Sequence, residues 1–231
     1  MKILGISGSP RDESTSGTFR IVKTVLEATG LEYDLVSLRG KAISGCIACC
    51  RCASDNVCKV EDDMKVLRDK IIEADAYVVG GPNYHSGLNS LTSAFFERFF
   101  QFRHREGNFL WGKLAVAVGI GGTTGTPAAD KIERSFLYHF VETVAKVSGQ
   151  GAASCYYCGY GDTCKVGIRY FLYGENAKTT PAPDVMKDQA LVASAIEAGR
   201  LLGARLRDNH DRKQVTAKMH AYAMERFKAS A

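Results

Sequence analysis

Apolar residues occur along the chain in two alternating arrangements. Short apolar or alternating segments predict β-strands at residues 2–7, 32–38, 76–80, 113–119 and 151–157. Stretches in which apolar residues recur every three or four positions predict helices at residues 17–29, 62–74, 86–104, 127–147, 184–209 and 212–231. Strands that alternate with helices in this way indicate an α/β protein with a parallel sheet.

The number of these elements narrows the fold class. Five strands with intervening helices favour a flavodoxin-like, doubly wound, five-stranded parallel sheet over the larger dinucleotide-binding fold. We expect one domain over residues 1–209, with cysteine-rich loop insertions at 46–58 and 155–164. Residues 210–231 are expected to form a basic C-terminal helix or tail.

One predicted helix is crowded with aromatic residues. Phe95, Phe99 and Phe102 are three or four positions apart and therefore lie on one side of the helix over residues 86–104. An aromatic face of this size is typical of a protein core or a subunit interface.

Composition and charge exclude several classes of protein. A hydrophobic content of 45% and a charged content of 24% exclude a disordered or fibrous chain. No run approaches the roughly 18 apolar residues of a membrane helix, and the N-terminus has no secretory signature, so we expect a cytoplasmic protein that does not bind membranes.

The net charge is +5, and residues 205–228 carry most of it. This basic segment is typical of a solvated helix; it could touch an acidic partner, but we do not expect nucleic-acid binding.

Three loops follow the first, third and fourth predicted strands. In an open parallel sheet, ligands bind at the carboxyl ends of the strands, so these loops are expected to converge. Residues 8–17 combine hydroxyl groups with a helix N-terminus, which suits an anion such as a phosphate, although an ordinary polar turn and helix cap would look similar. Residues 80–87 could bring backbone amides, Tyr84 and His85 against a flat ring, and the glycines of 119–125 allow close approach of the backbone.

These loops carry a resemblance to a known family. The sequence Gly-Ser-Pro-Arg followed by hydroxyl residues, then Gly-Pro-Asn-Tyr-His-Ser-Gly opening a helix, then a glycine loop, resembles the NADPH-dependent FMN reductases. The family usually has asparagine where this chain has Thr15. The resemblance implies that FMN phosphate is bound by Ser9, Arg11, Ser14, Thr15 and Ser16. It implies that the flavin ring is flanked by Pro82, Asn83, Tyr84, His85, Ser86, Gly87, Gly121, Gly122 and Thr123.

Eight cysteines are unusual for a chain without disulfide-forming context, and they favour metal binding or redox chemistry. Four of them have the spacing Cys46-x2-Cys49-x2-Cys52-x5-Cys58, which places four thiolates on one 13-residue loop. Such a loop can wrap an iron–sulfur cubane, whereas structural zinc more often uses two separated pairs. A disulfide or free thiols are the remaining alternatives, and Cys50 is expected to point away.

An FMN-reductase-like sequence with this cysteine loop resembles the iron–sulfur flavoproteins of anaerobic microbes. The resemblance implies one [4Fe-4S] cluster, ligated by the four cysteines named above, and one FMN per subunit. It also implies a homo-oligomer, a homodimer or homotetramer, in which the cluster of one subunit approaches the flavin of another.

A second cysteine group, Cys155-x2-Cys158-x5-Cys164, repeats the spacing of the last three positions of the first. It could bind a second metal or cluster, form a redox-active pair of thiols, or be inert. Cys155 falls within the predicted strand 151–157 and could be a core residue.

Three functions are compatible with these features. The first is electron transfer between ferredoxin or a similar one-electron carrier, the cluster and FMN, with reduction of an unknown acceptor. The second is an NAD(P)H-dependent FMN or quinone reductase whose cysteines hold a structural metal, and the third is a non-enzymatic redox sensor. No catalytic acid or base is assigned, because the cofactors carry the redox chemistry.

Overall fold

The computed structural model describes residues 1–105, 107–176, 178, 181–208 and 210–229. Its strands are β1 Lys2–Ser7, β2 Glu32–Ser37, β3 Ala76–Tyr84, β4 Gly87–Leu88, β5 Leu114–Gly121 and β6 Glu142–Gln150. Its α-helices are α1 Gly17–Ala28, α2 Met64–Glu73, α3 Ser90–Glu97, α4 Thr126–Leu137, α5 Ile168–Tyr173, α6 Gln189–Arg207 and α7 Arg212–Ala229.

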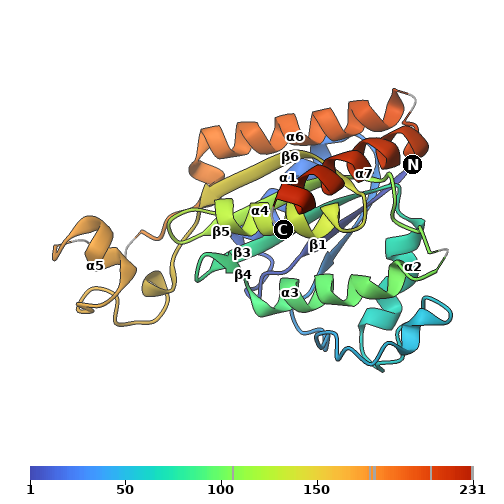
Figure 1. Cartoon of the computed structure of the whole chain (residues 1–231). Helices are drawn as coiled ribbons and strands as arrows, with labels where there is room; N and C mark the ends of the chain where they lie inside the picture. The colour runs from blue at the N-terminus through green and yellow to red at the C-terminus, as the bar shows by residue number, and fades with distance from the viewer. Residues whose placement is uncertain (106, 177, 179–180, 209, 230–231) are drawn as a thin grey trace.

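The sheet confirms the predicted fold class. Five parallel strands follow the order β2-β1-β3-β5-β6, and the short β4 adds an antiparallel pair at the end of β3. The strand order reverses beside β1, so the loops after β1 and β3 diverge to opposite sides of the sheet and leave a crevice at its carboxyl edge. Figure 1 shows this edge on the left of the molecule, where the β3–β4 hairpin ends.

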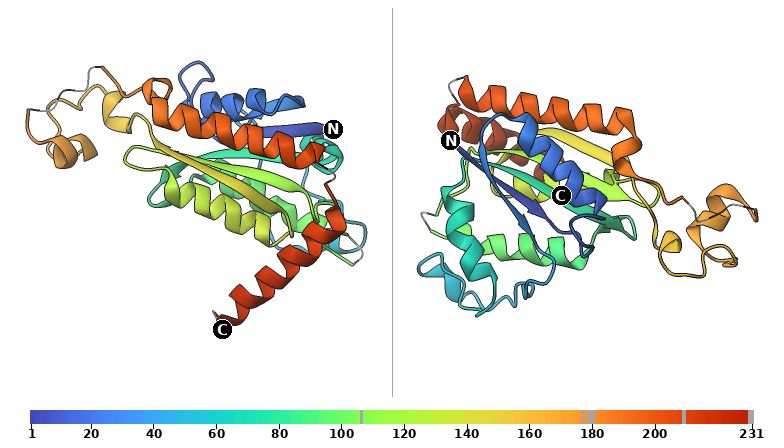
Figure 2. Two further views of the ribbon diagram at one scale, coloured as in Figure 1. Left: turned by 90° about the horizontal axis from the view of Figure 1, so that it is seen from above. Right: turned by 180° about the vertical axis from the view of Figure 1, so that it is seen from behind.

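Helices cover both faces of the sheet, as Figure 2 shows in two further views. Buried residues of α1, α6 and α7 pack on one face, and buried residues of α2, α3 and α4 pack on the other. The aromatic residues Phe95, Phe99 and Phe102 are each 1% exposed, so they belong to the core of the second face. The C-terminal helix α7 contributes Val215 and Met219 to the first face, and Lys218 forms an ion pair with Glu142 of β6.

Two predicted segments are wrong. The predicted helix 127–147 ends at Leu137, and residues 142–150 form the edge strand β6 instead of the predicted strand 151–157. Apolar residues at 137, 140, 141, 144 and 147 have helical spacing, but β6 is an edge strand whose two faces are only partly buried, so its burial does not alternate. Cys155 therefore lies in a short 3-10 helix, Ser154–Tyr156, and not in a strand.

The predicted helix 86–104 also differs in the structure. Residues 85 and 86 form the turn of the β3–β4 hairpin, α3 begins only at Ser90, and a 3-10 helix follows over Arg98–Phe102. The side chain of Asn89, the residue before α3, donates a 2.7 Å hydrogen bond to the carbonyl oxygen of Gly8. This contact ties the start of α3 to the loop after β1.

Lys113 lies just before β5 and is 2% exposed. Its Nζ atom donates hydrogen bonds to the carbonyl oxygens of Ile71 (3.2 Å) and Ile72 (2.6 Å) near the end of α2. Burial lowers the pKa of this amine to about 7.

We expect the buried Lys113 to make stability depend on pH. Above pH 7 the folded protein holds fewer protons at this position than the unfolded chain, so the free energy of unfolding rises toward higher pH. One proton contributes a slope of at most about 1.4 kcal/mol per pH unit. Urea unfolding of the reduced protein between pH 7 and 9 should show a steeper rise for the wild type than for Lys113→Met. Equal slopes in the two proteins would contradict this assignment.

Candidate flavin and cysteine sites

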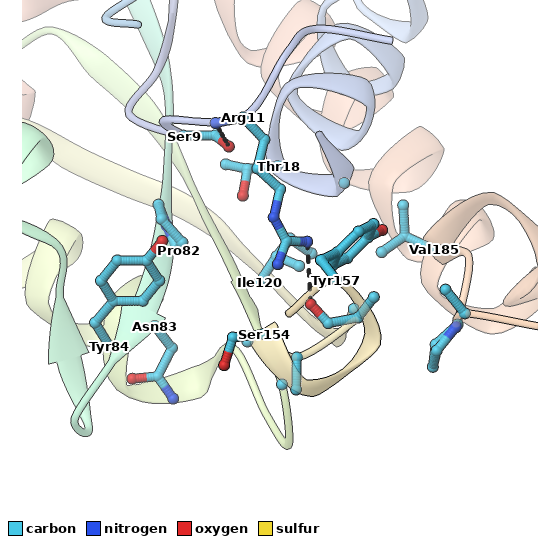
Figure 3. Close-up of a pocket in the computed structure, with 18 of the residues that line it drawn as sticks. Ser9, Arg11, Thr18, Pro82, Asn83, Tyr84, Ile120, Ser154, Tyr157 and Val185 are labelled. Atoms are coloured by element: carbon cyan, nitrogen blue, oxygen red, sulfur yellow. Dashed lines mark hydrogen bonds between the residues drawn. The ribbon is translucent and has the colours of Figure 1, made fainter. Parts of the chain in front are cut away.

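A cavity of about 810 Å³ lies at the carboxyl edge of the sheet. Its size is in the range of small-molecule and cofactor sites. The loops after β1, β3 and β5 all contribute to its wall, as do residues 151–154 after β6 and residues 182–185 before α6. Figure 3 shows side chains from these separate segments pointing into the same space.

The loop after β1 is organised by Asp12. Its carboxylate accepts hydrogen bonds from the backbone N–H (3.1 Å) and the hydroxyl (2.8 Å) of Ser14, and these bonds lower the pKa of Asp12. Its carbonyl oxygen accepts from the N–H groups of Thr15 and Ser16. The turn places Ser14 and Thr15 at the cavity, next to the first turn of α1.

The start of α1 supplies further donors. Ser16 is the N-cap, and its hydroxyl accepts the N–H of Phe19. The N–H groups of the first helical residues, Gly17 and Thr18, have no partner within the helix, and both residues line the cavity. Orphan helix donors surrounded by hydroxyl groups form an anion site.

Arg11 reaches across the cavity. Its Nη1 atom donates a 3.0 Å hydrogen bond to the carbonyl oxygen of Ala152, and its guanidinium lies 4.3 Å from the ring centroid of Tyr157. Figure 3 shows the Arg11 side chain extending to the ring of Tyr157. Arg11 therefore joins the loop after β1 to the segment after β6, besides adding a positive charge to the cavity wall.

The β3–β4 hairpin forms another side of the cavity. His85 and Ser86 both have left-handed backbone conformations, with φ values of 49° and 60°. A two-residue hairpin with positive φ at both central positions matches the twist of the strands but strains residues other than glycine. Tyr84 is 48% exposed at the cavity, and strain of this kind is often found at ligand sites.

Asn83 also lines the cavity, beside the β3–β4 hairpin, and its two side-chain polar atoms differ in their bonding. Its Nδ2 atom donates a 2.8 Å hydrogen bond to the carbonyl oxygen of Thr124, which holds the loop after β5. Its Oδ1 atom is buried and has no partner in the described part of the chain. A buried acceptor without a partner is costly unless a ligand donates to it. Open helix donors, hydroxyls and this acceptor fit the phosphate, ribityl and ring groups of FMN.

The cavity brings together most of the residues that the sequence analysis named. They are Ser9, Arg11, Ser14, Thr15, Pro82, Asn83, Tyr84, His85, Ser86, Gly121, Gly122 and Thr123. Ser16 serves as the helix cap and Gly87 lies in the hairpin, and neither lines the wall. Gly17, the last residue of the predicted anion loop 8–17, also lines the cavity. Sequence reasoning missed Thr18, Ser154, Tyr157 and Val185, of which only Thr18, at the start of the predicted helix, carried a signal.

The loop that holds Cys46, Cys49, Cys52 and Cys58 packs along α3 and the 3-10 helix that follows it. The Oε2 atom of Glu97 accepts the N–H of Cys46 (3.0 Å), and the Oε1 atom of Gln101 accepts the N–H of Cys58 (3.1 Å). The Nε2 atom of His104 lies 3.2 Å from the Sγ atom of Cys52.

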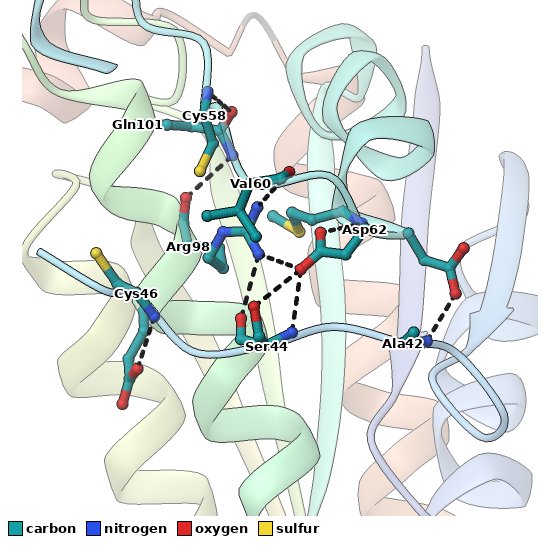
Figure 4. A network of polar contacts seen from close by, with 11 residues as sticks. Ala42, Ser44, Cys46, Cys58, Val60, Asp62, Arg98 and Gln101 are labelled. Atoms are coloured by element: carbon teal, nitrogen blue, oxygen red, sulfur yellow. Dashed lines mark hydrogen bonds and ion pairs between the residues drawn. The ribbon is translucent and has the colours of Figure 1, made fainter. Parts of the chain in front are cut away.

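Arg98 lies at the centre of these contacts, as Figure 4 shows. It is 2% exposed, forms an ion pair with Asp62, and donates to the carbonyl oxygens of Ser44 (3.2 Å) and Val60 (3.4 Å). Burial alone would raise the pKa of Asp62, but hydrogen bonds from Arg98 and from backbone amides outweigh it and lower that pKa. Arg98 also interacts with the thiol of Cys58.

The thiols of this loop have different environments. Burial, and then the neighbouring thiols of Cys58, Cys46 and Cys49, raise the pKa of Cys52. The N–H group and guanidinium of Arg51 lower the pKa of Cys49. The Cys50 thiol donates to the carbonyl oxygen of Ala48.

The described residues contain no three His, Cys, Asp or Glu side chains grouped closely enough for a single metal ion. A cubane cluster holds its four cysteines at separate corners, so it needs wider spacing than one ion. Four cysteines on one loop, with the positive charges of Arg98 and Arg51 beside Cys58 and Cys49, supply the number of thiolates and the counter-charge that such an anionic cluster requires.

Comparison with known proteins identifies the family that this chain resembles. Residues 1–156 match the family described as NADPH-dependent FMN reductase. An iron–sulfur flavoprotein of Methanocaldococcus jannaschii is 32% identical over 171 residues, which cover 70% of this chain and 82% of the relative. An iron–sulfur flavoprotein of Archaeoglobus fulgidus is 30% identical over 147 residues, covering 64% and 75%.

A solved structure supports the fold. RosB, determined with bound 8-demethyl-8-formylriboflavin-5'-phosphate, superposes with a TM-score of 0.58 at 18% identity, and the match covers 97% of this chain and 87% of RosB. At this level of identity the likeness concerns the fold alone. No helix in the described ranges is long and apolar enough to span a bilayer.

Proposed function

The chain belongs to the iron–sulfur flavoprotein branch of the NADPH-dependent FMN reductase family, and we propose that it transfers electrons between a one-electron carrier, a [4Fe-4S] cluster and FMN. As a member of this family it is a flavin-dependent oxidoreductase that binds FMN. The observation that carries the proposal is the four-thiol loop on the same chain as the flavin cavity. In this proposal the electron donor is a ferredoxin-like carrier and the electron acceptor is unidentified.

The two cofactors explain why one chain would have both sites. An iron–sulfur cluster exchanges one electron at a time and a flavin one or two, so together they connect one-electron carriers with two-electron acceptors. The chain's own residues bind and orient them. The first turn of α1 with Ser9, Ser14 and Thr15 would hold the phosphate, and Tyr84, Asn83 and the loop after β5 would flank the ring.

The residues around the cysteine loop would set the properties of the cluster. Cys46, Cys49, Cys52 and Cys58 would be its ligands. Arg98 beside Cys58 and Arg51 beside Cys49 would offset negative charge, and hydrogen bonding and exposure tune the potential of such centres. The Cys50 thiol is bonded within its own loop and would stay unligated.

The cysteine loop and the flavin cavity lie at different places in the chain, and this separation is relevant to the proposed oligomer. In Figures 1 and 2 the cysteine loop lies at the Glu97 end of α3, and the hairpin of the flavin cavity lies near its Ser90 end. The sites are thus separated within one chain. We include in the proposal a homodimer or homotetramer in which the cysteine loop of one subunit faces the flavin cavity of another.

The first test is the cofactor content of anaerobically purified protein. We expect about four iron and four sulfide bound through the first cysteine group, with one FMN per chain. The variant Cys49→Ser/Cys52→Ser should lose this iron and keep FMN, whereas Cys50→Ser should keep both. Flavin with zinc and no sulfide would contradict the proposal.

The second test separates the proposed donor from the alternative one. Reduced ferredoxin should bleach the flavin of the wild type and do so much more slowly in Cys49→Ser/Cys52→Ser. Rapid bleaching by NAD(P)H alone, unchanged in that variant, would instead favour an NAD(P)H-dependent FMN or quinone reductase. The family's description as NADPH-dependent is the observation that keeps this alternative.

A further inference from the structure

Three cysteines have no part in the function proposed above. Cys155, Cys158 and Cys164 lie in the segment between β6 and α6, which projects from the sheet at the cavity end of the molecule (Figure 1). The spacing of this group, two and then five intervening residues, repeats the spacing at the end of the first cysteine group.

Two of the three sulfur atoms of this segment border a common space. The Sγ atoms of Cys155 and Cys164 are 2.9 and 3.2 Å from the position that a Cβ atom would occupy at Gly167. Any side chain at 167 would therefore fill space that both sulfurs border. Two thiols that are nine residues apart in the sequence are brought to one place by the fold of this segment.

Cys158 lies at a turn that directs a backbone donor at its sulfur. Gly159 has a φ of 81°, a conformation that favours glycine, and the chain turns so that the N–H of Tyr160 donates to the Cys158 Sγ atom at 3.5 Å. The same sulfur is 3.7 Å from the carbonyl oxygen of Cys155. A hydrogen bond from N–H to sulfur stabilises the thiolate, and such bonds tune iron–sulfur clusters.

A buried positive charge lies against the same loop. Arg169 is 1% exposed, and its Nε atom donates a 2.7 Å hydrogen bond to the carbonyl oxygen of Gly161, between Cys158 and Cys164. Its Nη1 atom is buried with no partner among the described residues, and Arg169 takes part in none of the ion pairs found among those residues. A buried guanidinium is costly unless negative charge compensates it. Thiolates bound to a metal centre would supply that charge.

We propose that Cys155, Cys158 and Cys164 bind a second iron–sulfur cluster, with Arg169 as its buried counter-charge. Three thiolates leave one position of the cluster to a ligand from outside this loop. Of the neighbouring residues, Ser154, Tyr157 and Ile168 line the flavin cavity, so this cluster lies beside the flavin site of its own chain. The first cysteine group lies at the far end of α3. The proposal does not depend on whether that first group binds a cluster.

The test compares the iron and sulfide content of four full-length, anaerobically purified proteins. The wild type should hold about three to four iron beyond the four of the first group, with matching sulfide. Cys158→Ser should lose only this additional iron and keep FMN; because Cys158 is exposed, the change should leave folding intact. Cys50→Ser, an exposed cysteine of the other loop, is the matched control and should match the wild type.

The fourth protein separates the two cysteine groups. Cys49→Ser/Cys52→Ser should keep the additional iron and its electron paramagnetic resonance signal after reduction, even though the first group is lost. A wild type with no more than about four iron, all retained in Cys158→Ser, would overturn the proposal. Zinc released by Cys158→Ser without any loss of sulfide would overturn it as well.

Discussion

Replacing Arg98 with methionine is expected to lower the free energy of unfolding by about 3–5 kcal/mol, the usual cost of removing one partner from a buried ion pair. The Arg98 and Asp62 side chains are 1% and 8% exposed, so water cannot solvate the carboxylate that is left. The substitution also removes hydrogen bonds to the carbonyl oxygens of Ser44 and Val60. These bonds connect the two ends of the cysteine loop.

The measurement is urea unfolding of the reduced protein, with Arg39→Met as the matched control. Arg39 forms a 3.8 Å ion pair with Asp12, and both side chains are more than half exposed. Exposed pairs contribute about 0–1 kcal/mol, so this control should unfold almost like the wild type. If Arg98→Met lowered the free energy of unfolding by less than about 1 kcal/mol, the buried ion pair would contribute no more than an exposed one, and the prediction would be wrong.

Substituting alanine for Gly125 is expected to weaken FMN binding by about 10- to 100-fold, because an overpacked contact costs about 1–3 kcal/mol and each 1.4 kcal/mol is tenfold in affinity. A Cβ atom at 125 would lie 1.8 Å from the carbonyl oxygen of Gly119 and 2.8 Å from the N atom of Ile120. Both contacts are with backbone, so no side chain can move aside. The loop between them must open, and that loop places Gly121 and Thr123 at the cavity.

Flavin fluorescence titration of the apoprotein would measure this loss. Gly87→Ala is the matched control in the neighbouring hairpin, because the nearest atom to its Cβ would be the Tyr84 carbonyl oxygen at 3.9 Å. Gly87 does not line the cavity, so its variant should bind FMN as the wild type does. Equal affinities for the Gly125→Ala and wild-type proteins would show that the loop tolerates the opening.

The sequence predicts the fold where hydrophobic pattern and burial agree. The strand at residues 2–7 is a continuous apolar run, and in the structure β1 lies between two neighbouring strands and is buried over most of its length. The edge strand β6 was missed because its partly buried residues happen to have helical spacing. Local propensity without full burial leaves strand and helix hard to distinguish.

The sequence by itself determined the parallel sheet, the three loops at its carboxyl edge and the four-cysteine spacing. Each of these depends on neighbouring residues or on a general rule of open sheets. Only the tertiary structure decided that Arg11 donates to the carbonyl oxygen of Ala152, that Arg98 anchors the cysteine loop, and that Arg169 is buried beside the second cysteine group. These contacts join residues that can be far apart in the chain. A long side chain's partner depends on how elements pack, and that is not encoded in any local pattern.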